Sequence, residues 1–488
     1  MTAFDLVIKG GTVIAADHSS KADVGIRDGR IVAVADNLED GAQVIDASDR
    51  LVMPGGIESH CHIEEISADG LMSADDFHSG TVSAAFGGNT TIVPFAAQQR
   101  GQSLRQAVLD YRRLADPKVV IDYALHMIIS DPSPAVLEQE LPGLVAEGYT
   151  SFKVFMTYDR LRLSDYELIR VLAAARGLGA LVMVHPENHD MIRFVSELLV
   201  AQGHHAPKFH ALSHPRIAEE EAVNRMIALA ELVDVPLMIV HVSNGRVMER
   251  VRWAQEKGLR VYAETCPQYL VLTAADMDRP GQDGAKFCCS PPLRDEADGR
   301  ALWSGVEQNL FDVVSSDHAP YTFDEKGKFH KGFDARFDQL ANGMPGIEAR
   351  LPLLFSEGVG KGRISLNTFV ALAATNAARL YGLEACKGAI APGLDADIAI
   401  WDAEREVELS NIMLHDRVGY TPYEGMRVKG WPETVISRGR VVVGNGDLKA
   451  SAGSGRFVPA AVSALAQPRN RPVQELDPAS NFGVSLNY

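Results

Sequence analysis

Between residues 55 and 380 the chain alternates strand-length apolar runs with longer stretches of helical periodicity. This alternation constrains the fold strongly, because β–α repeats build parallel sheets whose faces are covered by helices. The expected strands are 56–63, 89–95, 120–129, 150–156, 180–185, 236–242, 260–264 and 312–317. The expected helices between them include 76–86, 103–114, 135–147, 165–178, 219–232 and 246–257. This pattern predicts a (β/α)8 barrel of the TIM type, with a doubly wound open sheet as the alternative.

The two ends of the chain follow a different rhythm, in which short alternating segments are separated by turn residues. Residues 4–53 have this pattern, and it returns after a helical stretch at 365–381. We therefore predict an α/β protein whose second, smaller β-sandwich domain is built from both chain ends. The predicted units are 1–53 (β-sandwich, first part), 54–385 (barrel), 386–450 (β-sandwich, second part) and 451–488 (tail). The tail is expected to be either loose or ordered by another subunit.

The composition argues against several classes of function. The 47 basic and 64 acidic residues give a formal net charge of −17, which disfavours a nucleic-acid partner or an anionic membrane surface. No apolar run reaches the roughly 18 residues of a membrane span, and the first residues do not resemble a signal peptide. The five cysteines are odd in number and scattered, so we expect reduced thiols and a cytoplasmic location.

Lys153 lies in the middle of the apolar run 150–156. Strand alternation places Lys153 and Phe155 on one face, and Phe152 and Val154 on the other. A buried ammonium without a partner costs several kcal/mol, so something must neutralise or use this side chain. One interpretation is a salt bridge to a buried acid. The other is an amine that has become a carbamate bridging two metal ions.

Polar residues also stand at the ends of other expected strands, where a (β/α)8 barrel places its chemistry. The first strand ends in His60 and His62, which alternation directs to the same side and which together can hold a metal ion. His185, His241 and Asp317 end the fifth, sixth and eighth strands. The following histidines are interpreted as core, helix or loop residues: His18, His78, His126, His189, His204, His205, His210, His214, His330 and His415.

These residue types have a shared chemistry. Neutral imidazoles and carboxylates suit Zn²⁺ or a similar divalent ion. Two ions roughly 3.5–4 Å apart need a bridging ligand, which a lysine carbamate could supply, and a bridging water would lose its proton near neutral pH. Asp317 could accept that proton and return it to the leaving nitrogen. The sequence therefore predicts metal-assisted hydrolysis.

Motifs spread over nearly the whole chain carry a family resemblance. They include Leu-Val-Ile-Lys-Gly-Gly-Thr-Val at 6–13, His-Cys-His at 60–62, Phe-Lys-Val-Phe-Met-Thr-Tyr at 152–158, His-Pro-Glu-Asn at 185–188, Ile-Val-His-Val-Ser at 239–243, Ala-Glu-Thr-Cys-Pro-Gln-Tyr-Leu at 263–270, Ser-Pro-Pro-Leu-Arg at 290–294, Ser-Asp-His-Ala-Pro at 316–320 and Asn-Gly-Met-Pro-Gly-Ile-Glu at 342–348. With these motifs the sequence resembles the dihydropyrimidinase and hydantoinase family of cyclic amidohydrolases, within the amidohydrolase superfamily.

The resemblance implies a hydrolase that opens a dihydropyrimidine, hydantoin or cyclic imide to an N-carbamoyl amino acid or half-amide, by attack of a metal-bridging hydroxide. It implies two divalent ions, with Zn²⁺ favoured over Mn²⁺ and Co²⁺. The implied ligands of one ion are His60, His62, Lys153 as N6-carboxylysine, and Asp317, and those of the other are Lys153, His185 and His241.

The resemblance also implies roles for residues outside the metal site. Asp317 would act as general base and then acid, and Tyr158 would donate its hydroxyl to the carbonyl oxygen of the substrate. Ser290 and Asn342 would bind the amide or imide edge of the ring. A homotetramer or dimer is implied, with residues 451–488 helping assembly.

The chain departs from the family pattern after the first metal motif, where relatives usually carry a hydrophobic lid. Here Glu65 and Asp69 make the lid more acidic, which would disfavour anionic substrates and weaken a preference for aryl substituents. The alternative is that both side chains simply face water. Position 64 is also a glutamate, where dihydroorotases place a carboxylate-binding arginine.

Two other functions are alternatives to ring opening of a dihydropyrimidine or hydantoin. An allantoinase or another cyclic-amide amidohydrolase would use the same metal chemistry, but Tyr158, Ser290 and Asn342 favour the first choice. A non-catalytic structural relative would lack the ligands, whereas all six are present here. The sequence identifies neither the ring nor its enantiomer.

Overall fold

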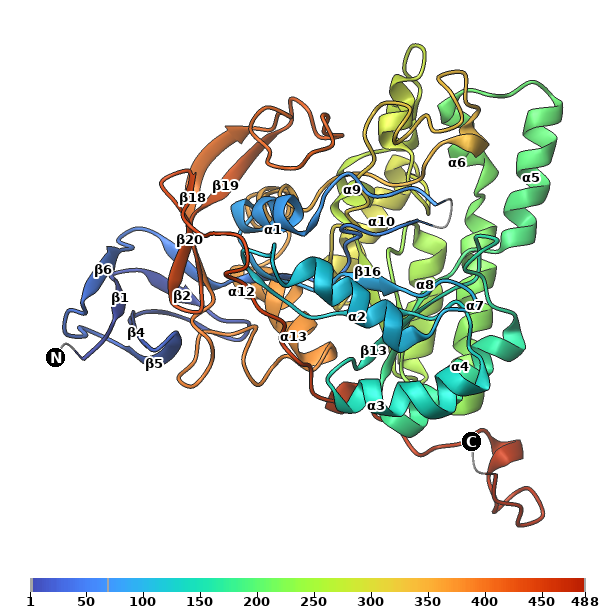
Figure 1. The fold of residues 1–488 in the computed structure, drawn as a ribbon, viewed down its shortest axis with the longest axis horizontal. Helices are drawn as coiled ribbons and strands as arrows, with labels where there is room; N and C mark the ends of the chain where they lie inside the picture. The colour runs from blue at the N-terminus through green and yellow to red at the C-terminus, as the bar shows by residue number, and fades with distance from the viewer. Residues whose placement is uncertain (1–2, 68–69, 487–488) are drawn as a thin grey trace.

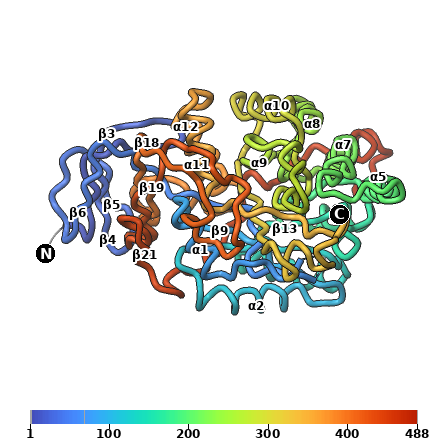
Figure 2. Tube along the Cα trace, turned by 90° about the horizontal axis from the view of Figure 1, so that it is seen from above, coloured from blue at the N-terminus to red at the C-terminus, as the bar shows by residue number. Residues whose placement is uncertain are grey.

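The computed structural model describes residues 3–67 and 70–486, which form an α/β architecture. Parallel strands surrounded by helices make up the larger region, and mixed sheets from both chain ends lie beside it, on the left of Figure 1. Seen from above in Figure 2, the blue strands near the N-terminus adjoin the orange and red strands β18, β19 and β21, while helices α5, α7, α8 and α10 lie at the far side. The expectation of an α/β fold is confirmed.

The larger parallel sheet has seven strands, and each strand pairs in parallel with its neighbour. In spatial order they are β10 (Phe95–Ala97), β12 (His126–Ile128), β13 (Ser151–Phe155), β14 (Leu181–His185), β15 (Leu237–Ile239), β16 (Val261–Thr265) and β17 (Val313–Val314). A second parallel sheet contains β11 (Asp122–Tyr123), β9 (Asn89–Ile92) and β8 (Gly56–Glu58). An isolated parallel bridge between Cys61 and His318 connects the segment after β8 to the segment after β17.

Two of the expected strands change partners midway. The stretch 120–129 forms β11 and β12, and the stretch 89–95 begins with β9 and leads into β10. In both cases the first half pairs in the three-stranded sheet and the second half in the seven-stranded sheet. The expected first strand, 56–63, is regular only over β8, and the expected last strand, 312–317, only over β17. The residues that follow these short strands are therefore free to adopt irregular backbone.

Helices follow most of the parallel strands. The α-helices are α1 (Phe77–Phe86), α2 (Leu104–Ala115), α3 (Leu141–Ala146), α4 (Asp165–Leu178), α5 (His189–Ala201), α6 (His210–Ser213), α7 (Arg216–Val233), α8 (Gly245–Glu256), α9 (Pro267–Val271), α10 (Glu296–Glu307), α11 (Arg350–Leu354), α12 (Leu366–Val370) and α13 (Asn376–Leu380). α4 shows how its sequence sets both ends: Ser164 and Glu167 form a capping box, and Gly179 ends the helix at φ 68°.

Wider and tighter turns interrupt or connect these helices. The expected helix 135–147 begins with the wide turn η1 (Ala135–Glu140) before α3, and the stretch 365–381 is broken by η7 (Ala371–Thr375). A third wide turn, η6 (Phe355–Val359), follows α11. The tight turns are η2 (Pro207–Phe209), η3 (Ala274–Met277), η4 (Asp283–Phe287), η5 (Phe337–Gln339), η8 (Ala464–Ala466) and η9 (Gln474–Leu476).

The mixed sheets combine the two ends of the chain. One has four strands: β5 (Arg30–Ala35), β4 (Asp23–Arg27), β1 (Leu6–Lys9) and β6 (Gln43–Asp46). The other has seven: β21 (Asp447–Leu448), β20 (Arg440–Gly444), β19 (Arg427–Ser437), β18 (Ile398–Glu408), β7 (Leu51–Pro54), β2 (Thr12–Ile14) and β3 (Ser19–Lys21). Strand β18 pairs with both β19 and β7, so the late segment completes a sheet begun by the early one.

The core lies on both faces of the parallel strands. In β13, Phe152 and Val154 belong to the cluster between sheet and helices, whereas Phe155 belongs to a separate cluster with Ile57 and Met183. The alternation expected for this strand is thus present, and it leaves Lys153 on the same side as Phe155.

The first part of the tail is ordered by its own chain. The Gly455 amide donates to the Val119 carbonyl over 3.1 Å, and Arg469 pairs with Asp234 at 3.1 Å. None of the helices in the described ranges combines the length and hydrophobicity needed to cross a lipid bilayer.

Candidate metal and active site

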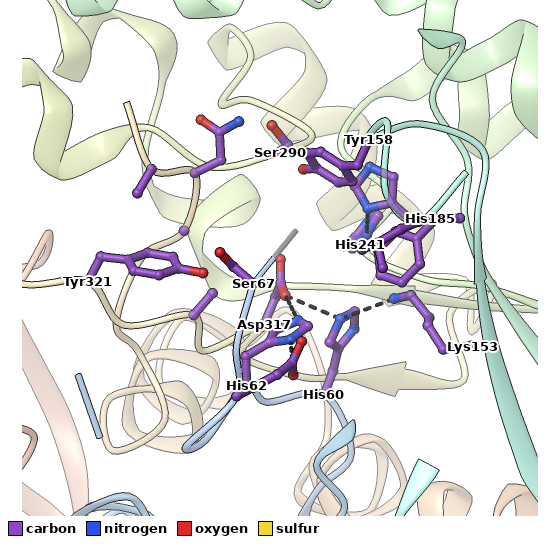
Figure 3. A pocket seen from close by; sticks show the side chains of 17 residues that line it. His60, His62, Ser67, Lys153, Tyr158, His185, His241, Ser290, Asp317 and Tyr321 are labelled. Atoms are coloured by element: carbon purple, nitrogen blue, oxygen red, sulfur yellow. Dashed lines mark hydrogen bonds and ion pairs between the residues drawn. The ribbon is translucent and has the colours of Figure 1, made fainter. Parts of the chain in front are cut away.

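One pocket, at the carboxyl ends of the parallel strands, brings together the nine residues that the sequence singles out (Figure 3). They are His60, His62, Lys153, Tyr158, His185, His241, Ser290, Asp317 and Asn342. The pocket is also lined by Glu65, Ser67, Phe155, Leu161, Ala319, Tyr321, Ala341 and Gly343. Several of them lie at or shortly after strand ends, namely His60 and His62 after β8, His185 at the end of β14, His241 after β15 and Asp317 after β17.

His60, His62 and Asp317 form the first group of potential ligands. Asp317 Oδ1 lies 3.2 Å from His60 Nε2 and 3.4 Å from His62 Nε2. The three ligand atoms all lie within 4.8 Å of one another, a spacing at which one ion could contact all of them. Two imidazoles and a carboxylate suit a divalent ion such as Zn²⁺.

His185 and His241 form the second group. Nδ1 of His185 and Nε2 of His241 are 2.8 Å apart, so both nitrogens face the same space. Lys153 lines the same pocket, and its Nζ lies 3.3 Å from Nε2 of His60 (Figure 3). The pocket therefore holds one group of nitrogen and oxygen donors, a second group of nitrogen donors, and a lysine.

Lys153 is buried without the acid that a salt bridge would need. Within the described ranges no carboxylate lies at ion-pair distance from its Nζ, and the aromatic neighbours Phe95 and Phe155 lie 5.0 and 5.3 Å away. Burial lowers the pKa of Lys153 to about 8, although Asp317 and Glu264 oppose this shift from a greater distance. The structure thus disfavours the salt-bridge interpretation of this residue.

Carboxylates contact the outward-facing nitrogens of the first imidazole pair. Nδ1 of His60 donates to Glu264 at 2.6 Å, and Nδ1 of His62 donates to Glu65 at 2.8 Å. These contacts fix the tautomer in which Nε2 carries the lone pair and faces the pocket, as is usual for metal-binding histidines.

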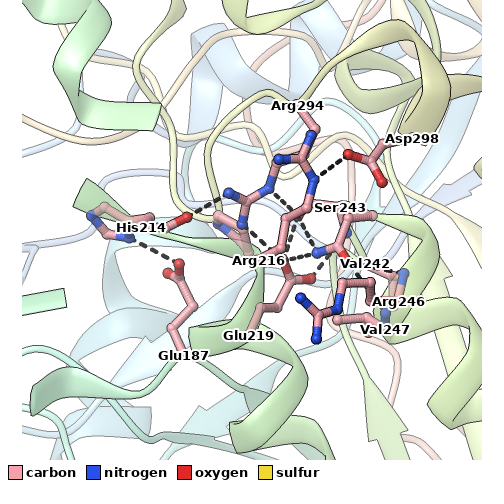
Figure 4. Close-up of polar contacts among 12 residues, drawn as sticks. Glu187, His214, Arg216, Glu219, Val242, Ser243, Arg246, Val247, Arg294 and Asp298 are labelled. Carbon is pink, nitrogen blue, oxygen red and sulfur yellow. Dashed lines mark hydrogen bonds and ion pairs between the residues drawn. The ribbon is translucent and has the colours of Figure 1, made fainter. Parts of the chain in front are cut away.

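His185 is supported in the same way, through a longer buried network (Figure 4). Its Nε2 donates to Glu187 at 2.9 Å, and the other oxygen of Glu187 accepts from His214 Nδ1 at 2.8 Å. The His214 carbonyl in turn accepts from Arg294, which pairs with Glu219 at 3.1 Å. The pKa of Glu187 is lowered because the two imidazoles outweigh the effect of burial, so this carboxylate is charged.

Three pocket residues have left-handed backbone although none is glycine. Tyr158, His241 and Asp317 have φ values of 69°, 40° and 48°. Such conformations cost of order 1–3 kcal/mol each and persist where the surrounding structure imposes them. Here they occur directly beyond the ends of β13, β15 and β17, where the chain turns and directs these side chains into the pocket.

Asp317 is the pocket carboxylate that contacts both imidazoles of the first group. Burial raises its pKa, but His60, His62 and Lys153 together outweigh burial, and the net shift is downward. The carboxylate is therefore charged at neutral pH, the state in which it can bind an ion or accept a proton.

Ser290 and Asn342 present polar atoms to the pocket. Ser290 Oγ and Asn342 Oδ1 are buried, and neither has a hydrogen-bond partner within the described part of the chain. Buried polar atoms normally have hydrogen-bond partners, so Ser290 Oγ and Asn342 Oδ1 are available to bind a polar ligand in the pocket.

The acidic lid does not simply face water. Glu65 is buried at the pocket wall and holds His62, whereas Glu64 turns the opposite way, pairs with Lys118 and accepts from the Phe77 amide at 3.1 Å. Asp69, the other acid of the expected lid, lies outside the described residues.

Comparison with known proteins agrees with this geometry. The amidohydrolase family model matches residues 51–442. The chain is 44% identical to D-hydantoinase of Ralstonia pickettii over 455 residues, covering 93% of this chain and 98% of that protein. It is 39% identical to D-phenylhydantoinase of Escherichia coli O7:K1 over 457 residues, or 93% and 97% of the two chains. The crystal structure of dihydropyrimidinase from Brevibacillus agri NCHU1002 superposes with a TM-score of 0.91 at 42% identity, covering 94% and 99%.

The chain belongs to the amidohydrolase family. The relatives place this amidohydrolase in the branch of hydantoinases and dihydropyrimidinases, so the resemblance expected from its motifs is confirmed.

The acids that support the imidazoles of this amidohydrolase are not among the residues predicted from the sequence. Glu264 is the last residue of an expected strand, and Glu187 follows the expected strand that ends at His185. Both positions fit the rule that located the histidines, so an acid near a strand end was the available signal. His214, expected to be an ordinary loop residue, is buried and bound to Glu187.

Proposed function

We propose that this amidohydrolase adds water across an amide C–N bond of a small cyclic amide and opens the ring. The substrate class is a dihydropyrimidine, hydantoin or cyclic imide, and the product is an N-carbamoyl amino acid or half-amide. The names of the relatives (D-hydantoinase, D-phenylhydantoinase and dihydropyrimidinase) support this reaction. The observation that carries the proposal is the meeting of four imidazoles, a lysine and an aspartate in one pocket.

The donor set fits two divalent ions, for which Zn²⁺ is favoured and Mn²⁺ and Co²⁺ are alternatives. The residues that would hold one ion are His60, His62, Lys153 and Asp317, and those that would hold the other are Lys153, His185 and His241. When bound, the ions would supply a water acidic enough to lose its proton near neutral pH and would polarise the amide carbonyl.

Lys153 would join the two sites as N6-carboxylysine. The ammonium would release one proton, and the neutral amine would then form an N–C bond to carbon dioxide and release a second proton. A buried cation would thus become an anionic carbamate with two oxygens. Two observations support this modification. Lys153 has no carboxylate at ion-pair distance within the described ranges, and its pKa of about 8 makes the neutral, nucleophilic amine accessible near neutral pH.

The side chains that face the pocket have complementary tasks in ring opening. Asp317 would accept the proton of the attacking water and then deliver it to the leaving ring nitrogen. Tyr158 would donate its hydroxyl to the carbonyl oxygen, where negative charge develops as the tetrahedral intermediate forms. Ser290 and Asn342, whose buried oxygens lie at the pocket wall, would fix the orientation of the ring.

We infer that the parallel strands close into an eight-stranded barrel spanning residues 54–385. Strands β9 and β11 run into β10 and β12, so the two parallel sheets share strands, and the Cys61–His318 bridge lies where the first and last strands would meet. The segments 1–53 and 386–450 would form one β-sandwich domain, since β7 and β18 pair directly.

We infer a homotetramer or dimer in the cytoplasm. Helix α5 has no buried residue, and Phe194 and Leu198 on it are 63% and 46% exposed, which suits contact with a second copy. Phe482 and Val484 in the tail are also exposed and could take part in assembly.

All five cysteines are free thiols, as expected of a reducing compartment. Light scattering of the purified protein would give the number of subunits.

The activity is tested by offering purified, zinc-supplemented protein a set of cyclic amides and following ring opening by ultraviolet absorbance. The set contains hydantoin, dihydrouracil, 5-phenylhydantoin, succinimide and allantoin. Opening of hydantoin or dihydrouracil supports the proposal, whereas opening of allantoin alone favours an allantoinase-like enzyme. An Asp317→Asn variant with an unchanged melting temperature serves as the control and should open none of them. Failure of the metal-loaded wild-type protein on every ring would contradict the proposed substrate class.

A further inference from the structure

Three lysines of this protein are buried within the described ranges, and the groups that surround each side-chain amine differ. Lys153 lies among the candidate metal ligands. Lys387 contacts the carboxylates of Asp122, Asp395 and Asp397 at 2.7, 3.1 and 2.6 Å. Lys328 is fully buried, yet no carboxylate of the described chain lies at ion-pair distance from it. The position of this charge therefore needs another explanation.

The ammonium of Lys328 is bound by three backbone carbonyls. Its Nζ donates to the carbonyls of Cys288, Ala341 and Gly343 at 2.9, 2.8 and 2.6 Å. These contacts use all three donors of the ammonium group. The partial negative charges of three converging carbonyls would repel one another without a cation between them. Lys328 thus links two segments of the chain through one ammonium group.

The two segments are those that carry the candidate ring-binding residues. Ala341 and Gly343 are the immediate neighbours of Asn342, so their carbonyls are held on both sides of it. Cys288 lies two residues before Ser290, and its carbonyl also accepts from the Gly343 amide at 3.0 Å. The ammonium therefore fixes the backbone next to Asn342 and close to Ser290, whose side-chain oxygens lack hydrogen-bond partners in the described chain.

We propose that Lys328 is a positioning residue for substrate binding, whose ammonium holds the segments of Ser290 and Asn342 in the geometry that receives the amide edge of the ring. This inference rests on the proposed function. Lys328 does not line the pocket and does not contact the candidate metal ligands. Its removal should therefore affect binding of the ring and leave the metal ions in place.

The test replaces Lys328 by methionine, which keeps an unbranched apolar stem and removes the three donors. We expect KM for hydantoin to rise by roughly tenfold or more, because small displacements of groups that orient a substrate are costly. The value of kcat should change by less than about threefold, since Asp317 and Tyr158 are untouched, and the metal content should equal that of the wild type.

A control must separate this effect from general loss of stability. Lys387→Met is unsuitable, because it would remove the buried cation that three buried carboxylates share. Val435→Ala is a better control, since Val435 is fully buried in β19, away from the pocket. It should lower the melting temperature and leave KM unchanged.

A second variant addresses the case in which Lys328→Met does not fold. A Cβ at Gly343 would lie 2.4 Å from the Ala319 carbonyl oxygen, so Gly343→Ala should displace the Asn342 segment with Lys328 intact and should also raise KM. A wild-type KM in folded Lys328→Met overturns the role of Lys328. A wild-type KM in folded Gly343→Ala overturns the premise of that role, namely that the position of the Asn342 segment controls ring binding. Absence of ring opening by the wild type on any cyclic amide overturns the proposed function, and with it this inference.

Discussion

Glu65 accepts a hydrogen bond from Nδ1 of His62 over 2.8 Å, so an acid of the pocket lid supports a candidate metal ligand. The backbone explains how it reaches there. Glu64 has a left-handed conformation, with φ 48°, and its side chain points towards Lys118 while Glu65 turns inward. The Glu65 amide and carbonyl are both bonded to Ser73, which holds the lid against the pocket.

Replacing Glu65 by methionine should weaken metal binding at the His62 site by about 10–100-fold, because carboxylates that orient a metal-binding histidine typically contribute this much. Dialysis of the variant against buffers of defined free Zn²⁺, with metal analysis, measures the effect. Glu64→Gln is the matched control and should bind zinc like the wild type, since Glu64 does not contact His62. Equal zinc affinity in Glu65→Met and the wild type would contradict this role.

Replacing Lys153 by alanine should remove both the bridge and the second ion. Ring opening should fall by more than the roughly 10–100-fold expected for losing a residue that only supports a ligand. Metal analysis should show fewer than two ions per subunit. Acetate or propionate, placed in the space left by the side chain, should restore part of both. Full activity and full metal content in Lys153→Ala would exclude the carbamate.

The sequence was sufficient to select the candidate ligands that the structure brings into one pocket, because their signal is local. His185 and His241 directly follow apolar runs, Asp317 ends an expected strand after two serines, and Lys153 interrupts an apolar run. Strand alternation and the rule for strand ends were therefore enough. The fold class followed from the same alternation, although the expected strands proved longer than the regular ones.

The acids near strand ends were visible in the sequence, but their pairing with particular histidines could not be predicted, because these contacts join distant parts of the chain. Glu264 contacts His60, which lies 204 positions earlier in the sequence, and no local pattern around either residue predicts this pairing. Lys328 lies in a polar stretch after Glu325 and Lys326, a sequence context typical of a surface residue. Only the packed structure shows it buried against carbonyls that lie 13 to 40 positions away.

Asp312 should make the stability of the protein depend on pH. Burial raises its pKa from 3.8 to about 7, so the folded protein retains a proton that the unfolded chain has already released. Below about pH 4 Asp312 is protonated in both states and does not change the free energy of unfolding. As the pH rises from about 4 to about 7 the free energy of unfolding falls, and above about pH 7 it stays at the lower value. An Asp312→Asn variant keeps an acceptor for the Ala263 amide, which donates over 2.9 Å, but cannot ionise.

The comparison is made by melting wild-type and Asp312→Asn proteins at pH 5 and pH 8. The variant should gain stability relative to the wild type between these values, by about 1–3 kcal/mol from a shift of this size. A difference between the two proteins that stays constant from pH 5 to pH 8 would show that Asp312 titrates normally.

The proposed function requires that a pair of divalent ions, held by the candidate ligands at the strand ends, enables ring opening. It is tested most directly by removing all metal with a chelator and titrating the protein with Zn²⁺ while hydantoin and dihydrouracil hydrolysis is followed. We predict that the metal-free protein is inactive and that activity rises until two ions are bound per subunit. Ring opening by the metal-free protein, or none after two ions have bound, would contradict the account.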